Sequence, residues 1–218
     1  MDGRLKSPLP NGENFIEEQL HKKALWLSYF TVGYNVLEGV VSILAGLLSN
    51  SVALLAFGSD SFIESLSGGI MIWRFGKHGK VSHEEEEKAE KKAAKLVGAT
   101  FFILGSYVLF ESVKKLITQE APDPSLLGIV IAVVSLVVMP ILFYAKYRLG
   151  KKLGSKSLVA DSKQTLACMF LSAALLVGLG LNYLFGLWQA DPVAGLVIVI
   201  FLFKEGYETL KEGQLECC

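Results

Sequence analysis

The stretch 51–75, SVALLAFGSDSFIESLSGGIMIWRF, limits the possible folds more than any other part of the chain. It is long enough to cross a bilayer as a helix, for which roughly 20 apolar residues are needed. It nevertheless carries Asp60 and Glu64 near its middle. An ionised carboxylate at the centre of a membrane helix costs about 2.5–3.5 kcal/mol, so these two acids require a partner. Residues four apart share a helical face, so the two carboxylates are well placed to bind one cation.

The rest of the chain is also apolar and divided into segments. With 52% hydrophobic and 19% charged residues, the chain is too apolar for a soluble domain of 218 residues. Its formal net charge is zero, so nucleic acid is not an expected partner. The pattern predicts an all-α, polytopic membrane protein with six transmembrane helices. The expected spans cover residues 25–48, 51–75, 94–117, 126–147, 158–184 and 192–210.

The segments on either side of the spans define the expected domain boundaries. Residues 1–24 are expected to form a polar tail and an amphipathic helix lying along the membrane surface. Residues 25–210 form the six-helix transmembrane domain, and residues 211–218 form a short cytosolic tail ending in Cys217 and Cys218. This Cys pair either passes soft metal ions to the membrane domain or belongs to a disordered or lipid-modified tail. No cleavable signal peptide is evident.

The positive charges predict the orientation. Of the 21 Lys and Arg residues, 18 fall in the N-terminal segment, the loops after the second and fourth spans, and the C-terminal tail. Both termini are therefore expected in the cytosol, with the chain in a plasma or inner membrane. The residues assigned to the loop after the fourth span are Lys146, Arg148, Lys151, Lys152 and Lys156.

Polar residues inside the spans are expected to meet. Counting along the helices from their outer ends places Glu38, Asp60, Glu64 and Cys168 at comparable depths. Ionisable residues within a membrane are functional candidates because the bilayer makes them costly to keep for packing alone. The alternative is a buried structural network, and for Glu38 a hydrogen bond to Asn35 or another neighbour.

The fifth span carries three candidates on one face. Asp161, Gln164 and Cys168 follow an i, i+3, i+7 pattern, whereas Lys163 points elsewhere. Asp161 is nearer the cytosolic end, where it is expected at the entrance to the site. A lone membrane Cys is more often a small hydrophobic residue than a ligand. The candidate metal ligands are Glu38, Asp60, Glu64, Asp161, Gln164 and Cys168.

Three sequence motifs carry a resemblance to a known family. SNSVALLAFGSDSFIES in the second span, VADSKQTLAC in the fifth and DPVAGLVIVIFLFKEG in the sixth resemble the cation diffusion facilitator (cation efflux) superfamily. The chain is most similar to a short six-helix branch that lacks the cytosolic C-terminal domain. The resemblance implies a metal site formed by an acid pair on the second helix and a His or Asp plus Asp on the fifth. By position, Asp60 and Glu64 match the first pair; Gln164 and Cys168 match the second, without the usual His.

The resemblance also implies the activity, which is export of a divalent metal from the cytosol in exchange for protons. Two neighbouring carboxylates in a low dielectric cannot both stay ionised without a cation, so metal binding should release protons from the site. Carboxylates with a thiolate favour Zn²⁺, whereas a protonated Cys with Gln favours Mn²⁺ or Fe²⁺. Zinc is the first expectation, as a transported ion and not as a cofactor. The expected partners are the metal ion, protons, the lipid bilayer and a second copy of the chain in a homodimer.

Two other classes of function are alternatives to transport. In a non-transporting membrane scaffold or metal sensor, the acids would pair with Lys163 or with backbone groups. An enzyme is not expected, because the spans contain no His cluster, nucleophile motif or phosphate-binding loop.

Overall fold

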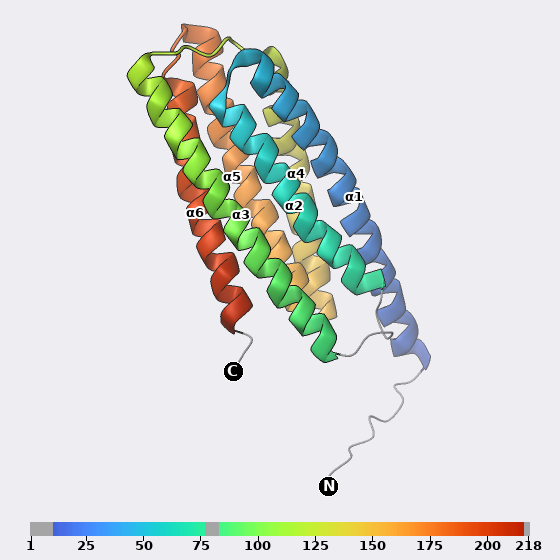
Figure 1. The fold of residues 1–218 in the computed structure, drawn as a ribbon. Helices are drawn as coiled ribbons and strands as arrows, with labels where there is room; N and C mark the ends of the chain where they lie inside the picture. Colours follow the sequence, from blue (N-terminus) through green and yellow to red (C-terminus); the bar gives the residue numbers. More distant parts are fainter. Residues whose placement is uncertain (1–10, 77–82, 216–218) are drawn as a thin grey trace.

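The computed structural model describes residues 11–76 and 83–215. Its elements are six helices: α1 (Asn11–Ser49), α2 (Val52–Gly76), α3 (His83–Thr118), α4 (Leu126–Leu153), α5 (Lys156–Phe185) and α6 (Ala190–Leu215). They run up and down, so that the start of α1 and the end of α6 lie at the same end of the bundle (Figure 1). The prediction of a six-helix all-α fold is confirmed. Residues 1–10 and the pair Cys217 and Cys218 lie outside the described residues.

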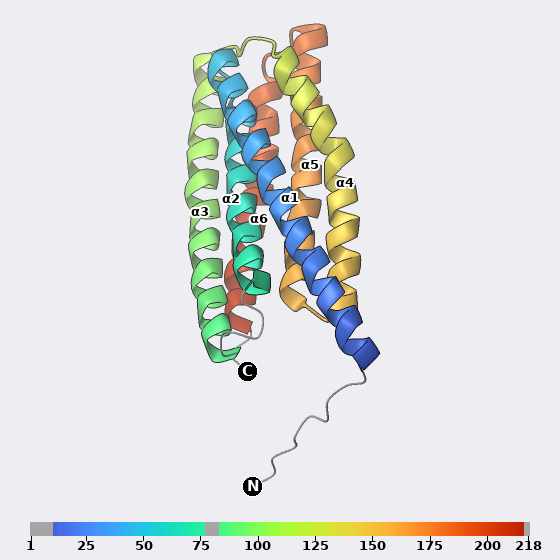
Figure 2. The same ribbon diagram turned by 90° about the vertical axis from the view of Figure 1, so that its right-hand side faces the viewer.

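The helix contacts divide the bundle into two groups; in Figure 2, α3 lies on one side of the bundle and α4 on the other, with α1 crossing in front. Helices α1, α2, α4 and α5 contact one another through the pairs α1–α2, α4–α5, α1–α4 and α2–α5. Helices α3 and α6 form a second pair, which packs against α2 and α5. Because α2 contacts α1, α3, α5 and α6, the acids near its middle lie inside the bundle.

Glycines allow the closest helix crossings. A Cβ atom on Gly58 of α2 would lie 3.0 Å from the carbonyl oxygen of Gly39 on α1. The same substitution at Gly98 of α3 would place its Cβ atom 3.2 Å from the carbonyl oxygen of Gly206 on α6. Small residues at these positions let two backbones approach closely, as membrane helices commonly do.

Helix α1 is continuous, which corrects one expectation. The surface helix expected before residue 25 is an extension of the first membrane helix, because α1 runs unbroken from Asn11 to Ser49. The sequence contains no Gly or Pro between residues 13 and 32, so nothing there interrupts the helix.

The basic loop expected after the fourth span is largely helical. Helix α4 ends at Leu153 and α5 begins at Lys156, so only Gly154 and Ser155 connect them. Gly154 has the positive φ of 63° that favours glycine after a helix, and its N–H donates to the carbonyls of Gly150 and Lys151. The Ser155 hydroxyl accepts from the N–H of Leu158 and caps α5. Lys, Arg and Leu are good helix formers, so the basic segment continues α4 up to this glycine.

Helix α1 is apolar outside and polar inside. Its outward residues include Trp26, Phe30, Leu37, Leu44 and Leu48, each more than half exposed. Its buried residues recur at helical spacing and are mostly polar: Ala24, Ser28, Thr31, Asn35, Glu38, Ser42, Ala45 and Ser49. This is the reverse of a soluble protein and is typical of a helix whose outer face meets lipid.

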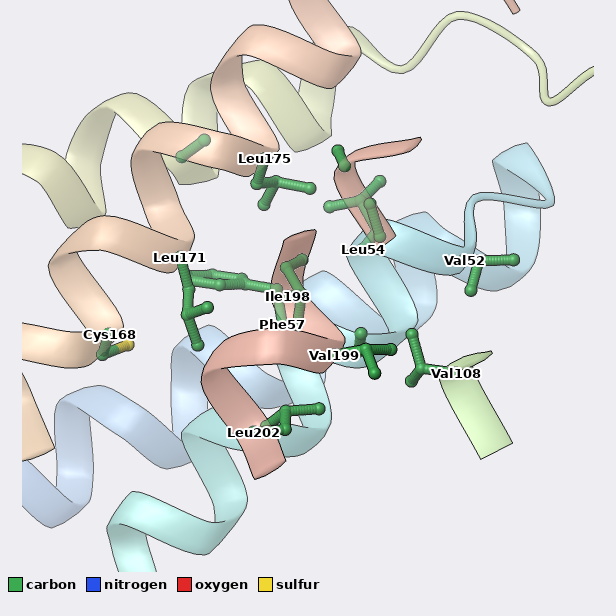
Figure 3. Packing of buried hydrophobic residues seen from close by; sticks show 14 of the residues in the cluster. Val52, Leu54, Phe57, Val108, Cys168, Leu171, Leu175, Ile198, Val199 and Leu202 are labelled. Carbon is green, nitrogen blue, oxygen red and sulfur yellow. The ribbon is translucent and has the colours of Figure 1, made fainter. Parts of the chain in front are cut away.

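Helices α4 and α5, like α1, have the length and hydropathy of membrane spans. Among the described residues, three segments are long and apolar enough to cross a membrane: 18–49, 126–153 and 157–185. A buried apolar cluster holds α2, α5 and α6 together through Phe57, Leu171 and Ile198 (Figure 3). Cys168 lies at the edge of this cluster, where the buried side chains change from apolar to polar.

Candidate metal centre

Asp60 and Glu64 lie one turn apart on α2, and both carboxylates are buried inside the bundle. The thiol of Cys168, on α5, lies next to both of them. The charges of Glu38 on α1 and Glu205 on α6 also act on Asp60. Acidic or thiol groups from four helices therefore lie within electrostatic range of Asp60 inside the bundle. Sequence analysis predicted Glu38 and Cys168 there, but it missed Glu205.

Glu64 has one occupied and one unoccupied carboxylate oxygen. Its Oε1 accepts a hydrogen bond from the Thr165 hydroxyl and receives the Lys146 ammonium at 3.4 Å. Its Oε2 is buried and has no hydrogen-bond partner among the described residues. An ionised carboxylate accepts through both oxygens, so Oε2 retains capacity for a cation or a proton.

Lys146 is the main residue that sequence analysis missed. It was counted with the basic residues of the following cytosolic loop, although it falls at the end of the expected span 126–147, and the loop assignment was wrong. The side chain lies in α4 and is 1% exposed. Its ammonium lies 2.9 Å from Asp161 Oδ2 and 2.8 Å from Thr165 Oγ1, besides its longer contact with Glu64. We call Glu64, Lys146, Asp161 and Thr165 the lysine cluster.

The sequence does hold a signal for Lys146. The buried residues of α4 recur at alternating spacings of four and three, and Lys146 continues that series: Gly128, Ala132, Ser135, Met139, Leu142, Lys146 and Leu149. The residues next to it in sequence are cationic and apolar, which obscured this pattern.

The other two candidates on α5 have different surroundings. Asp161 is buried, bound to Lys146 through Oδ2 and to the Ser67 hydroxyl through Oδ1 at 3.1 Å. Gln164 is half-buried, and its Nε2 has no hydrogen-bond partner among the described residues. Lys163, which the scaffold alternative invoked, is exposed.

Glu38 belongs to a network between α1 and α2. The Tyr34 hydroxyl donates to its Oε1 at 2.8 Å, and the Ser61 hydroxyl donates to its Oε2 at 2.9 Å. Both oxygens are thus occupied, as expected of a structural carboxylate. One turn away, Asn35 is fully buried, and neither of its amide atoms has a partner among the described residues.

The described side chains do not form a closed metal site in this arrangement. No group of three or more His, Cys, Asp and Glu residues within the described ranges is placed to hold a metal ion. The positive charge beside Glu64 and Asp161 is supplied by Lys146. In this arrangement an internal cation therefore binds two of the candidate ligands, Glu64 and Asp161.

A second group of buried charges lies at the opposite end of the bundle from the start of α1 and the end of α6. The Asp191 carboxylate, at the start of α6, accepts from the Ser51 hydroxyl and from the N–H of Val52 at 3.1 Å. Ser51 itself caps α2 by accepting from the N–H of Leu54. Nearby, the Lys115 ammonium donates to the carbonyl and side-chain oxygens of Asn50. We call Asn50, Ser51, Lys115 and Asp191 the cap cluster.

Comparisons with known proteins agree with this architecture. A family model described as the cation efflux transmembrane domain matches residues 29–216. The chain is similar to transmembrane protein 163 of Xenopus laevis, with 20% identity over 89% of this chain and 69% of the relative. It is 23% identical to a cadmium, cobalt and zinc/H(+)-K(+) antiporter of Bacillus subtilis, over 90% of this chain and 63% of the relative. It is 29% identical to the cation-efflux pump FieF of Shewanella oneidensis, over 77% of this chain and 58% of the relative.

The chain thus spans less than two thirds of the length of the Bacillus and Shewanella relatives. The family match nevertheless covers all six helices, the first of them from residue 29 onward. The chain therefore belongs to the cation efflux transmembrane domain family and is a polytopic membrane protein, as its motifs predicted.

Proposed function

We propose that this chain exports a divalent metal cation, with Zn²⁺ as the substrate, in exchange for protons at Asp60 and Glu64. The observation that carries the proposal is the buried Glu64 Oε2, unpartnered among the described residues, on the turn after Asp60 and next to Cys168. Buried polar atoms normally have partners, so an unpartnered carboxylate oxygen in a membrane interior suits a passing ion. Family membership and the name of the Bacillus subtilis antiporter support a divalent metal and protons as the exchanged ions.

The chemistry of the donors favours zinc. Asp60, Glu64 and Cys168 offer two carboxylates and a thiol, and Zn²⁺ binds both kinds of ligand in fourfold coordination. If Cys168 remains protonated and Gln164 contributes its amide oxygen, the site becomes harder and favours Mn²⁺ or Fe²⁺. Glu38 and Asp161 belong to the same proposal as residues lining the route of the ion. Their carboxylates already have protein partners, so they are secondary to Asp60 and Glu64.

Orientation and assembly are further parts of the proposal. The start of α1 and the end of α6 lie at one end of the bundle, and the distribution of Lys and Arg favours a cytosolic location for that end (Figure 1). Export then carries the metal from this end toward the cap cluster. A homodimer is also proposed, and cross-linking of the purified chain in lipid tests it.

One observation favours a non-transporting scaffold or sensor instead. The Lys146 ammonium binds Glu64 and Asp161, and such a pairing is what a purely structural network requires. The pairing does not account for Asp60 or for Glu64 Oε2, and for this reason transport is the preferred function.

The test is metal-dependent proton flux in sealed liposomes containing the full chain. Zn²⁺, Mn²⁺, Fe²⁺ and Cd²⁺ are compared on the wild type and on Asp60→Ala with Glu64→Ala. A matched control replaces two exposed acids, Glu120→Ala with Glu208→Ala. We expect zinc-driven proton flux in the wild type and the control, and none in the Asp60 and Glu64 variant. Equal flux in all three proteins, or none with any metal, contradicts the proposal and favours the scaffold.

A further inference from the structure

The lysine cluster joins three helices through a single ammonium group. Lys146 comes from α4, Asp161 and Thr165 from α5, and Glu64 from α2. The ammonium lies 2.8 Å from Thr165 Oγ1, 2.9 Å from Asp161 Oδ2 and 3.4 Å from Glu64 Oε1. An ammonium has three N–H donors, so all three are used.

The three contacts differ in strength. Charge-assisted hydrogen bonds between nitrogen and carboxylate oxygen are usually about 2.7–2.9 Å long. The contact with Asp161 falls in this range, whereas the contact with Glu64 is considerably longer. Lys146 is thus held tightly by α5 and loosely by α2. It is able to release Glu64 while keeping two of its partners.

Burial of the Lys146 ammonium is electrostatically costly, and the carboxylates beside it offset that cost. Lysine is almost never fully buried unless it is paired, because an isolated buried ion is strongly unfavourable. One ammonium balances only one of the two carboxylates that it touches, and Glu64 Oε2 has no hydrogen-bond partner among the described residues. The region therefore keeps room for additional positive charge next to Asp60.

We propose that Lys146 is the resident cation of the empty site and that a divalent metal must displace it from Glu64 in order to bind. This inference rests on the proposed function and deepens it by adding a positioning residue. Because two cations repel within a few ångströms, the metal and the ammonium cannot share Glu64 at low cost. When metal binds at Asp60 and Glu64, Lys146 withdraws onto Asp161 and Thr165. When metal leaves, the ammonium returns and restores the attraction between α2 and α4.

The proposal predicts opposite effects on affinity and on turnover. Without the ammonium, the metal meets no competitor, so Lys146→Gln should bind Zn²⁺ roughly tenfold more tightly or better. The same variant should release its ion slowly, so both KM and the maximal flux should fall. Lys146→Arg keeps the positive charge and should retain the wild-type affinity to within about threefold.

The experiment is calorimetric titration of Zn²⁺ into the full chain in lipid nanodiscs, paired with zinc flux in liposomes. Lys163→Gln is the matched control, because Lys163 is an exposed lysine on α5 outside the lysine cluster. If Lys146→Gln does not fold, Lys146→Gln with Asp161→Asn replaces it, since this pair removes one charge of each sign.

The outcomes separate this inference from the proposed function. Tighter zinc binding with slower flux in the Lys146 variant, and no change in the control, supports the inference. If the wild type transports zinc and the variant binds it with unchanged or weaker affinity, Lys146 is only structural and the inference is overturned alone. If the wild type neither binds nor transports Zn²⁺, Mn²⁺, Fe²⁺ or Cd²⁺, the proposed function fails and the inference fails with it.

Discussion

The cap cluster and the lysine cluster each bury a lysine together with acidic side chains. Asp191 in the cap cluster and Glu64 in the lysine cluster are bound in different ways. Asp191 in the cap cluster accepts from a backbone N–H and from a hydroxyl that itself caps α2. Those donors are fixed by the start of the helix. Glu64 in the lysine cluster is bound by a hydroxyl and a long side chain, and it keeps one oxygen unpartnered among the described residues.

This difference shows that burial of an acid does not by itself identify a functional site in a membrane protein. An acid that caps a helix satisfies orphan N–H groups and holds two helices in register. An acid bound by flexible groups can exchange one partner for another. We therefore assign the cap cluster to stability and the lysine cluster, with Asp60, to ion exchange.

The comparison is tested most severely by removing one acid from each cluster. Glu64→Gln should reduce zinc flux to about a tenth of the wild-type rate or less, because the amide cannot balance a divalent charge. Asp191→Asn, measured in the same liposomes, should keep a KM for zinc close to the wild-type value in the protein that remains folded. An equal loss of flux per folded molecule in both variants contradicts the division of roles.

A smaller change is expected in the free energy of unfolding when the Asp191 carboxylate is removed. Asp191→Ala leaves the N–H of Val52 and the Ser51 hydroxyl without their acceptor, which should cost about 1–3 kcal/mol of unfolding free energy. Thermal unfolding in detergent measures the change, and Glu120→Ala at an exposed position is the control. If Asp191→Ala were as stable as the control, the cap cluster would not have the structural role given to it.

Within the lysine cluster, Thr165→Val should change the affinity for zinc moderately. The Thr165 hydroxyl lies between Lys146 and Glu64 and hydrogen bonds with each of them. Valine has nearly the same shape, so the lost hydrogen bonds should change zinc affinity by about twofold to tenfold. Calorimetric titration checks this, with Ser162→Ala on the same helix as the comparison. An unchanged affinity indicates that Thr165 does not link the two groups.

The smallest change in the KM for zinc is expected when Glu38 loses one hydrogen-bond donor. Tyr34→Phe removes one donor from this carboxylate and leaves the Ser61 hydroxyl in place. Since the Ser61 hydroxyl still binds Glu38, and Glu38 is secondary to Asp60 and Glu64 in the proposal, the KM for zinc should change by less than about twofold. Zinc flux as a function of zinc concentration gives the value. A large increase in KM would place Glu38 among the ion ligands.

The helices and the central acids follow from the sequence because their signals are local. Six apolar segments predicted six helices, and the cost of Asp60 and Glu64 in a membrane indicated that they face the interior. The continuous α1 and the short connection at Gly154 and Ser155 were missed, because hydropathy was given more weight than helix propensity. At the end of α4 the helix continues through Gly150 and ends only before Gly154, whose φ is positive.

Lys146 and Glu205 could not be assigned by counting charges along the chain. Lys146 lies close to the end of a span, where positive charge usually marks a cytosolic loop. Its burial depends on the packing of α4 against α5, which aligns it with Asp161 and Thr165. Glu205 lies within electrostatic range of Asp60 because α6 packs against α2. Such contacts between distant segments are properties of the assembled bundle.

In the proposed mechanism Asp60 and Glu64 bind the transported metal, and the position of a bound metal ion shows whether they do. Crystals of the full chain soaked in Zn²⁺ would be measured at the zinc absorption edge. We predict an anomalous peak about 2.0–2.2 Å from oxygens of both carboxylates, with the Lys146 ammonium withdrawn from Glu64 onto Asp161. A peak bound by other residues, or no peak while Lys146 stays on Glu64, would contradict the account.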